Sequence, residues 1–377
     1  PADDPTCGTI TTHYDYHSIN DRIVKLDILG HDDPTMIRML DNMLGEGYCK
    51  NIPVGDPDTM ELFLSTKSIG VSPEDIMTDV ATYGVPECGT RFVRQMISDV
   101  KPKNFSDLLR ISGYSHGTDV WLNNAQDLIK NGTPTEDTIS TRDDIMNWLI
   151  NKGMEPSMAF GIMEWARKGK AHKQGFKAEQ EEAFKKANIP EFYIKSCKTL
   201  QYLFPKAHAV AYVLSAYRIA YCKVHHPKEF YSAYFTIRAP KFDFVEVHKG
   251  INFMRSFIKN VGQQGTKASV NDKETATYME LAVEMLARGF EFEDVDLYRS
   301  DAHQFIVTDK GLLPPLGAIG GIGGVAAENI VKARSKGPFI SREDLRNRAK
   351  ISNTAVEVLA DLGVLEGLPE TDQIELF

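Results

Sequence analysis

Helical periodicity runs almost without interruption from about residue 57 to residue 235 of this chain. Apolar residues recur at the spacing of an α-helix that buries one face. Short segments rich in glycine, proline, serine and asparagine interrupt the pattern and predict turns; they are GVP, SGYSHGTD, NGTPT and KGMEPS. A stretch of this length and pattern predicts a set of packed helices rather than a sheet.

The segments on either side of this region add a smaller β component. Residues 9–30 predict two strands, because TITTHYDYHSI alternates and IVKLDIL is a β-branched run. Asp33 and Pro34 then predict a helix with Asp33 as its N-cap, and Gly45 ends it. Further along we expect a helix over 274–290, a hairpin within 302–315, a helix to about residue 334 and a helix pair over 341–362. The expected fold class is therefore α+β and predominantly α-helical.

Composition narrows the class of protein. The chain has 377 residues, of which 42% are hydrophobic and 25% charged, as in an ordinary globular protein. The sequence contains no run of 18 apolar residues, the length that would predict a membrane-spanning helix. The first residues, PADDPTCGTI, do not resemble a secretory signal. Five dispersed cysteines without a C-x-x-C pair argue against a disulfide framework and a thiolate zinc site. We therefore expect a cytoplasmic protein with free thiols, cut from a longer chain.

Charge is distributed unevenly along the chain. The net charge is −9, but residues 160–260 hold 18 Lys and Arg against 8 Asp and Glu. Such a local excess is typical of a surface that binds a polyanion such as nucleic acid. A solvated charged face is the alternative interpretation.

Asp27 is the first candidate for chemistry. It lies in the apolar run VKLDILG just before a predicted strand-to-helix turn, and a buried carboxylate there requires compensation. A divalent metal would compensate it, and so would Lys25 or a helix N-terminus. His13, Asp15 and His17 share one face of the preceding predicted strand and offer a weaker zinc alternative.

The segment FPKAHAVAYVLSAYRIAYCKVHHP, residues 204–227, is the second candidate. A helix is expected after Pro205, with Lys206 and His208 at its positive N-terminal end, where they could hold a triphosphate. Tyr202 and Tyr212 could stack on a base. Arg142 and Arg91 are further candidate cations, and a buried core helix with charged ends remains the alternative.

Glycines at 320–324, in AIGGIGGVAAENIVKAR, form the third candidate. Their spacing is typical of a helix-hairpin-helix unit, in which backbone N–H groups approach a DNA phosphate at a helix N-terminus. Gly321, Gly323, Gly324 and the following Lys332 would make these contacts. A Rossmann site is excluded, because no βαβ unit surrounds the glycines.

The terminal QIELF is the fourth candidate. It follows LPETD, which has no periodicity, so we expect a tail that is free to dock in extended form. Its anchors would be Gln373, Ile374, Leu376 and Phe377.

Together these segments resemble the C-terminal part of a bacterial C-family replicative DNA polymerase, most closely a Gram-positive PolC-type DNA polymerase III alpha subunit. They follow the order of that family along the whole chain: TTHYDYHSINDRIVKLDILGHDDPTMIRML, VPECGTRFVRQM, ISGYSHGTDVWLNNAQDLI, RDDIMNWLI, FPKAHAVAYVLSAYRIAYCKVHHP, IGGIGG and QIELF. The resemblance implies that residues 1–60 end the palm and 61–239 form the fingers. Residues 240–367 would be a tandem helix-hairpin-helix DNA-binding domain, and 368–377 a clamp-binding tail.

The resemblance also implies residue roles. Asp27 matches the third of three palm aspartates that hold two Mg²⁺ ions. The other two have no match in residues 1–26 and would come from an upstream polymerase region. The fingers residues that would contact the incoming dNTP are Arg142, Tyr202, Lys206 and His208. The expected partners are primer–template DNA, dNTP, a sliding clamp at the terminal QIELF, and the upstream region, with no membrane.

The expected function is DNA-directed DNA synthesis in chromosomal replication, by two-metal nucleotidyl transfer to a primer 3′-OH. The chain alone is expected to be inactive. A non-catalytic DNA-binding and clamp-tethering module is the main alternative. A helix-hairpin-helix repair nuclease or ligase would need a nucleophilic Lys motif or a carboxylate cluster near the hairpins, and the sequence has neither.

Overall fold

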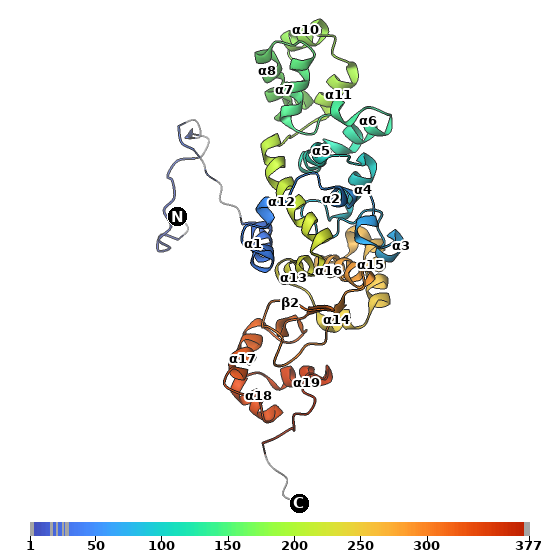
Figure 1. The fold of residues 1–377 in the computed structure, drawn as a ribbon. Helices are drawn as coiled ribbons and strands as arrows, with labels where there is room; N and C mark the ends of the chain where they lie inside the picture. The colour runs from blue at the N-terminus through green and yellow to red at the C-terminus, as the bar shows by residue number, and fades with distance from the viewer. Residues whose placement is uncertain (1–3, 16–17, 20–21, 25, 27–29, 373–377) are drawn as a thin grey trace, which may run out of the picture. The chain divides into compact units, whose positions relative to one another are not determined.

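The structure is a computed structural model that describes residues 4–15, 18–19, 22–24, 26 and 30–372. The chain divides into two units, residues 1–32 and 33–377. Each unit is described by itself, and Figure 1 shows the course of the chain.

The two strands expected within residues 9–30 are absent from the described part of that segment. Its apolar side chains have no face to bury: Ile10, Val24 and Leu26 are 97%, 83% and 82% exposed. A two-stranded hairpin is marginal in water unless a further strand or helix packs on it. The prediction of strands was therefore wrong for the residues that can be described. Alternating apolar residues form a stable sheet only when a further strand or a helix packs on their apolar face.

Helices build the second unit. Over the described residues they are α1 (Asp32–Leu44), α2 (Pro57–Glu61), α3 (Pro73–Ile76), α4 (Arg91–Val100), α5 (Phe105–His116), α6 (Gln126–Lys130), α7 (Arg142–Asn151), α8 (Pro156–Arg167), α9 (Lys170–Gln174), α10 (Ala178–Lys186), α11 (Glu191–Thr199), α12 (Lys206–His225), α13 (Pro227–Ile237), α14 (Phe244–His248), α15 (Ile251–Gln264), α16 (Val270–Ala287), α17 (Gly324–Arg334), α18 (Arg342–Ala349) and α19 (Asn353–Asp361). Single 3₁₀ turns lie at Cys49–Asn51, Lys67–Ile69, Thr135–Asp137, Gly265–Lys267 and Leu316–Ala318, and an irregular π-type turn lies at Trp121–Ala125.

Local sequence signals explain the ends of α1. Pro34 lies in its first turn, and the helix ends just before Gly45, whose φ of 122° few other residues tolerate. The helix begins at Asp32, two residues before Pro34, its predicted first position, so Asp33 lies inside the helix and its prediction as the N-cap was wrong. Asp33 is buried and its Oδ1 atom lies 2.6 Å from Nη1 of Arg238, so this carboxylate ties α1 to the end of α13.

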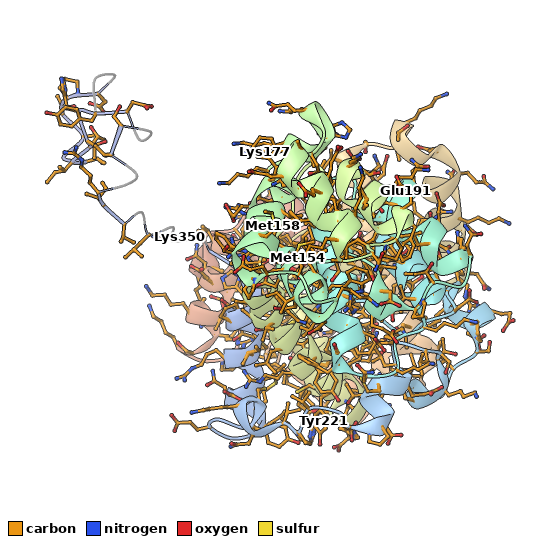
Figure 2. All side chains as sticks on the ribbon, turned by 90° about the horizontal axis from the view of Figure 1, so that it is seen from above. Met154, Met158, Lys177, Glu191, Tyr221 and Lys350 are labelled. Carbon is orange, nitrogen blue, oxygen red and sulfur yellow. The ribbon has the colours of Figure 1, made fainter. Side chains whose placement is uncertain are left out.

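Helix α12 runs through the middle of the helical region and packs against α2, α5, α7 and α13 (Figure 1). It begins at Lys206, directly after Pro205, as predicted. Side chains fill the space between the helices (Figure 2). The buried positions of α12 are mostly small or aliphatic, which lets neighbouring helices approach closely; they include Ala209, Val213, Ala216, Ile219 and Ala220.

A small sheet is formed by the chain between α16 and α17. Its strands are β1 (Glu291–Phe292), β2 (Ile306–Val307) and β3 (Gly311–Leu313), in the order β1-β3-β2. The antiparallel pair β2–β3 confirms the predicted hairpin. Strand β1 pairs parallel to β3 and was not predicted. A Cβ atom at Gly311 would lie 2.2 Å from the carbonyl oxygen of Glu291, so only glycine permits this pairing.

The fold class is confirmed as α+β and predominantly helical. Part of the positive excess over residues 160–260 serves internal ion pairs rather than one exposed surface. Lys223 is completely buried against Glu284, and Arg238 pairs with Asp33. Within the described residues, no helix combines the length and the apolar character needed to span a membrane.

Candidate functional site

The four residues predicted to contact a nucleotide lie around Phe204, between α11 and α12. The ring of His208 stacks on that of Phe204, with centroids 4.8 Å apart and planes at 26°. Tyr202 meets Phe204 edge-on at 5.1 Å. Arg142 donates its backbone N–H to the carbonyl oxygen of Phe204 at 3.1 Å, and Lys206 begins the helix two residues later. Residues 142 and 202–208, remote in sequence, therefore share one region of the fold.

The two cations of this cluster lie beside carboxylates. The side chains of Arg142 and Lys206 are 35% and 41% exposed. Nε of Arg142 lies 4.0 Å from Oδ2 of Asp143, and Nζ of Lys206 lies 3.9 Å from Oδ1 of Asp144. The backbone N–H of Lys206 donates to Oδ2 of Asp143 at 2.6 Å. Asp143 thus accepts the first N–H of α12, at the helix end where Lys206 and His208 were predicted to hold a triphosphate.

Tyr202 is held in place by a short β-bridge while its side chain remains 45% exposed. The N–H of Thr118 donates to the carbonyl oxygen of Tyr202 at 3.0 Å, and the N–H of Gln201 donates back to Thr118 at 3.2 Å. A half-exposed aromatic ring on a fixed backbone suits stacking on a base. Tyr212, the other predicted stacking residue, instead packs against His208 at 4.4 Å.

His116 and Glu87 belong to the same cluster and were not predicted. His116 ends α5, and its ring lies 5.6 Å from that of Phe204 and 5.8 Å from that of His208. Its Nε2 atom is 3.0 Å from Oε2 of Glu87. Hydrogen bonding to Glu87 raises the pKa of His116, and hydrogen bonding to His116 lowers the pKa of Glu87. The segment SGYSHGTD was interpreted as a break between helices and as part of the family resemblance, and no role was given to His116, although a histidine in a helix's last turn is a useful signal.

The glycine-rich hairpin is present between the 3₁₀ turn Leu316–Ala318 and α17. Gly321 has a φ of 91°, and Gly320 donates its N–H to Oδ1 of Asp243 at 3.2 Å. Gly323 caps α17 and has no atom within 4 Å of the position its Cβ would take. Lys332 is exposed in the last turn of α17, about 12 Å along the axis from Gly324 at 1.5 Å per residue. The structure therefore places Lys332 at the other end of this helix from the glycines.

The second helix pair, α18 and α19, is present as predicted, and Lys350 with a φ of 53° begins the turn between them. The segment after α19 is not free, contrary to expectation. The backbone N–H groups of Arg342 and Glu343 donate to the carbonyl oxygens of Pro369 and Glu370 at 2.8 and 3.1 Å. These are first-turn donors of α18 that lack a partner within their own helix. Residues 369–372 therefore cap α18.

Two groups of predicted site residues lie outside the described residues. They are Asp27, with its predicted metal role, and the tail residues Gln373, Ile374, Leu376 and Phe377. His17 of the zinc alternative also lies outside them. Over the parts of the chain that are described, no cluster of three or more His, Cys, Asp or Glu side chains could hold a metal ion.

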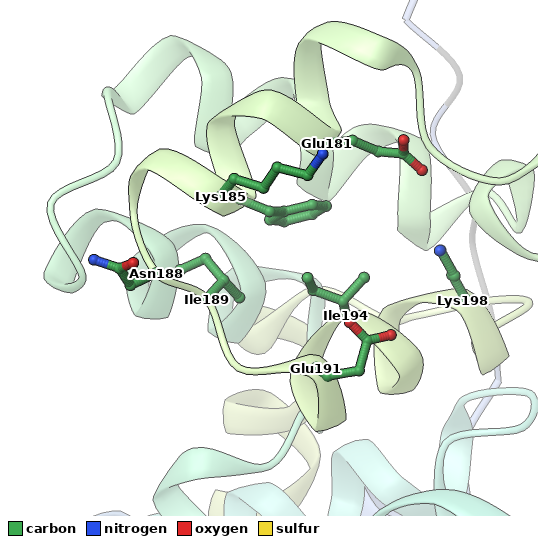
Figure 3. A pocket seen from close by; sticks show the side chains of 8 residues that line it. Glu181, Lys185, Asn188, Ile189, Glu191, Ile194 and Lys198 are labelled. Carbon is green, nitrogen blue, oxygen red and sulfur yellow. The ribbon is translucent and has the colours of Figure 1, made fainter.

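A hollow of about 620 Å³ lies between α10 and α11 (Figure 3). Phe184, Ile189 and Ile194 form its apolar lining, and side chains of both charges surround it. None of the predicted nucleotide or DNA contacts lines this hollow.

Comparison with known proteins shows what the chain is similar to. Residues 33–189 match the bacterial DNA polymerase III alpha subunit finger domain, and residues 289–373 match a helix-hairpin-helix motif. Over 378 aligned residues the whole chain is 53% identical to the PolC-type DNA polymerase III of Oceanobacillus iheyensis and 52% identical to that of Bacillus subtilis. It is 50% identical to that of Caldanaerobacter subterraneus. The chain spans about a quarter of these relatives, 26–27% of their length.

Proposed function

We propose that this chain acts in template-directed DNA synthesis, as the part of a PolC-type replicative polymerase that binds the incoming dNTP and holds the DNA duplex. The observation that carries the proposal is the convergence of Arg142, Tyr202, Lys206 and His208 on Phe204, within a chain similar over its full length to PolC-type polymerases. Residues 1–60 would complete the palm. The chain as a whole would be the C-terminal part of the polymerase.

In this mechanism the fingers residues stabilise the negative charge of the triphosphate. Arg142 and Lys206 would bind phosphate oxygens, and Tyr202 would stack on the nucleotide. Asp143 now accepts the N–H of Lys206. A triphosphate at the N-terminus of α12 would replace this carboxylate, so nucleotide binding would release Asp143 from α12.

Asp27 would hold Mg²⁺ together with aspartates from the preceding part of the polymerase. When bound, Mg²⁺ lowers the pKa of the primer 3′-OH and neutralises charge on the triphosphate and the leaving pyrophosphate. Base selection would come from pairing with the template inside a tight pocket.

The duplex would be held by backbone N–H groups at Gly321, Gly323 and Gly324, with Lys332 reaching a second phosphate along the same strand. Residues 373–377 would dock on a sliding clamp, with residues 369–372 fixing their point of departure beside α18. Such a polymerase would act in the cytoplasm.

The alternative is a non-catalytic tether that binds DNA and the clamp. It shares the helix-hairpin-helix contacts and the tail, but it has no use for a nucleotide site. Saturable dependence on dNTP therefore separates the two functions.

The test is a chimera in which this chain replaces the matching quarter of the Bacillus subtilis relative. Primer extension is measured at several dNTP concentrations with Lys206→Ala, and with Lys249→Ala as a matched control on an exposed ion pair. Losing a charged phosphate contact costs about 1.5–3 kcal/mol, so the KM for dNTP should rise about 10- to 100-fold. The control should leave KM unchanged.

An unchanged KM in the Lys206→Ala chimera would contradict the assigned nucleotide site. A chimera that binds primer–template DNA and clamp but cannot extend the primer would favour the tether.

A further inference from the structure

Both ring nitrogens of His116 contact groups that accept hydrogen bonds. Nδ1 lies 2.7 Å from the backbone carbonyl oxygen of Ser112, and Nε2 lies 3.0 Å from the carboxylate of Glu87. The hydroxyl of Ser115 lies 3.1 Å from Nδ1 and donates to the same Ser112 carbonyl oxygen at 3.0 Å. A carbonyl oxygen and an ionised carboxylate cannot donate, so each ring nitrogen that bonds to one of them carries a proton. The geometry therefore favours His116 as an imidazolium, and its position in the last turn of α5 favours a cation as well.

Glu87 is held in an uncommon conformation. Its φ is 64°, in the left-handed region that non-glycine residues rarely occupy. Residues before and after Glu87 hold the loop by donating to the two carbonyl oxygens that follow it. The hydroxyl of Thr82 donates to the carbonyl oxygen of Cys88 at 2.8 Å, and the guanidinium of Arg94 donates to that of Gly89. Strained backbone of this kind tends to occur where a side chain must be aimed.

The ring of His116 faces the proposed nucleotide cluster. It lies 5.6 Å from Phe204, 5.8 Å from His208 and 6.3 Å from Tyr212, centroid to centroid. Because both of its N–H groups are already used, His116 is not suited to bind phosphate itself. It contacts the ring pair Phe204–His208 from the side of α5.

We propose that Glu87 and His116 are positioning residues of the nucleotide site, in which Glu87 keeps His116 charged and His116 fixes the stacked rings of Phe204 and His208. This inference rests on the proposed function and adds two residues to it. It predicts a pH dependence that a purely packing role would not produce.

The charged and titratable groups around the pair are few. Glu87 faces His116 from the loop before α4, His208 and Tyr212 face it from α12, and Arg238 acts on Glu87 from the end of α13.

Hydrogen bonding raises the pKa of His116. The contribution of its charged ring to folding stability is therefore complete below the ordinary value near 6.5 and is lost as pH rises through the raised value. The lowered pKa of Glu87 makes its contribution present above about 4.5 and lost as pH falls through the lowered value.

The first experiment observes the pair in the 377-residue chain, by ¹H–¹⁵N spectra of the histidine rings against pH. At pH 7 both nitrogens of His116 should be protonated. Glu87→Gln should lower the pKa of His116 and shift the ring signals of His208, with the backbone spectrum otherwise unchanged. Glu328→Gln is the matched control, because it removes the carboxylate of an exposed Glu–His pair.

The second experiment measures KM for dNTP in the chimera at pH 6 and pH 8. Glu87→Gln removes the carboxylate that raises the pKa of His116, so a larger fraction of His116 should be neutral at pH 8 than at pH 6, and larger than in the unaltered chimera. The ratio of variant to wild-type KM should therefore grow about five- to tenfold between these pH values, whereas Glu328→Gln should show a constant ratio.

A neutral His116 at pH 7 in the unaltered chain would overturn the proposal. If Glu87→Gln lowers the pKa of His116 but the ratio of variant to wild-type KM stays constant between pH 6 and pH 8, the positioning role alone is overturned. An unaltered chimera that cannot extend primers would refute the proposed function, and the positioning role with it.

Discussion

Replacing Lys223 with methionine should destabilise the fold strongly, because Lys223 is a completely buried cation with three hydrogen bonds. Its Nζ atom donates to the carbonyl oxygens of Ala81 and Tyr83 at 2.7 and 2.6 Å, and to Oε2 of Glu284 at 2.8 Å. Burial lowers the pKa of Lys223 to about 8, which leaves it mostly charged at pH 7.

The expected cost follows from what the substitution leaves behind. Lys223→Met keeps the volume but leaves the carboxylate of Glu284 buried without its cation, although the hydroxyl of Tyr231 still donates to it at 2.8 Å. Removing one member of a buried ion pair typically costs about 3–5 kcal/mol. Lys249→Met removes a cation from an exposed pair with Glu246 and should cost less than about 1 kcal/mol.

Urea unfolding followed by far-ultraviolet circular dichroism measures both variants. The double variant Lys223→Met/Glu284→Leu should recover part of the loss, because it leaves no buried charge. Equal stability of Lys223→Met and Lys249→Met would refute the reasoning. So would a double variant that is less stable than the sum of its two single changes predicts.

Two further predictions concern the DNA and clamp contacts. Gly323→Val should weaken duplex binding about tenfold without loss of stability, because the new side chain meets only open space in the protein but blocks the approach of a phosphate. Gly161→Val, at another glycine in open space, is the control, and equal binding by the two variants would contradict this contact. Deleting residues 373–377 should abolish clamp stimulation of the chimera on long templates and leave clamp-free synthesis unchanged, whereas stimulation that survives the deletion would place the clamp site elsewhere.

The sequence predicted well those elements whose signals are local. The start of α12 after Pro205, the end of α1 at Gly45 and the hairpin at 309–311 each depend on residues within one turn of the boundary. The resemblance also named four residues of the cluster at Phe204 together, although helical periodicity could not join them. Glu87 and His116, which belong to the same cluster, were not named.

Long-range partners explain the rest. Strand β1 pairs with β3 across about 20 residues, and Glu87 meets His116 through a loop whose backbone no propensity specifies. Residues 369–372 have no pattern of their own, and their contacts with α18 come from its unpaired N–H groups and from the side chains of Ser341 and Arg342. The expected strands in residues 9–30 failed for the opposite reason, since the described residues provide them no surface to cover.

The most direct test of the central claim is primer extension by the chimera carrying Asp27→Asn, beside Asp58→Asn as an exposed control. Loss of a metal-binding carboxylate should reduce the rate by a factor on the order of a thousand, about 4 kcal/mol, while primer–template binding stays intact. The isolated chain should bind the same DNA and not extend it. Near-normal extension by the Asp27→Asn chimera, with the control equally active, would contradict the assignment of this chain to the catalytic part of a polymerase.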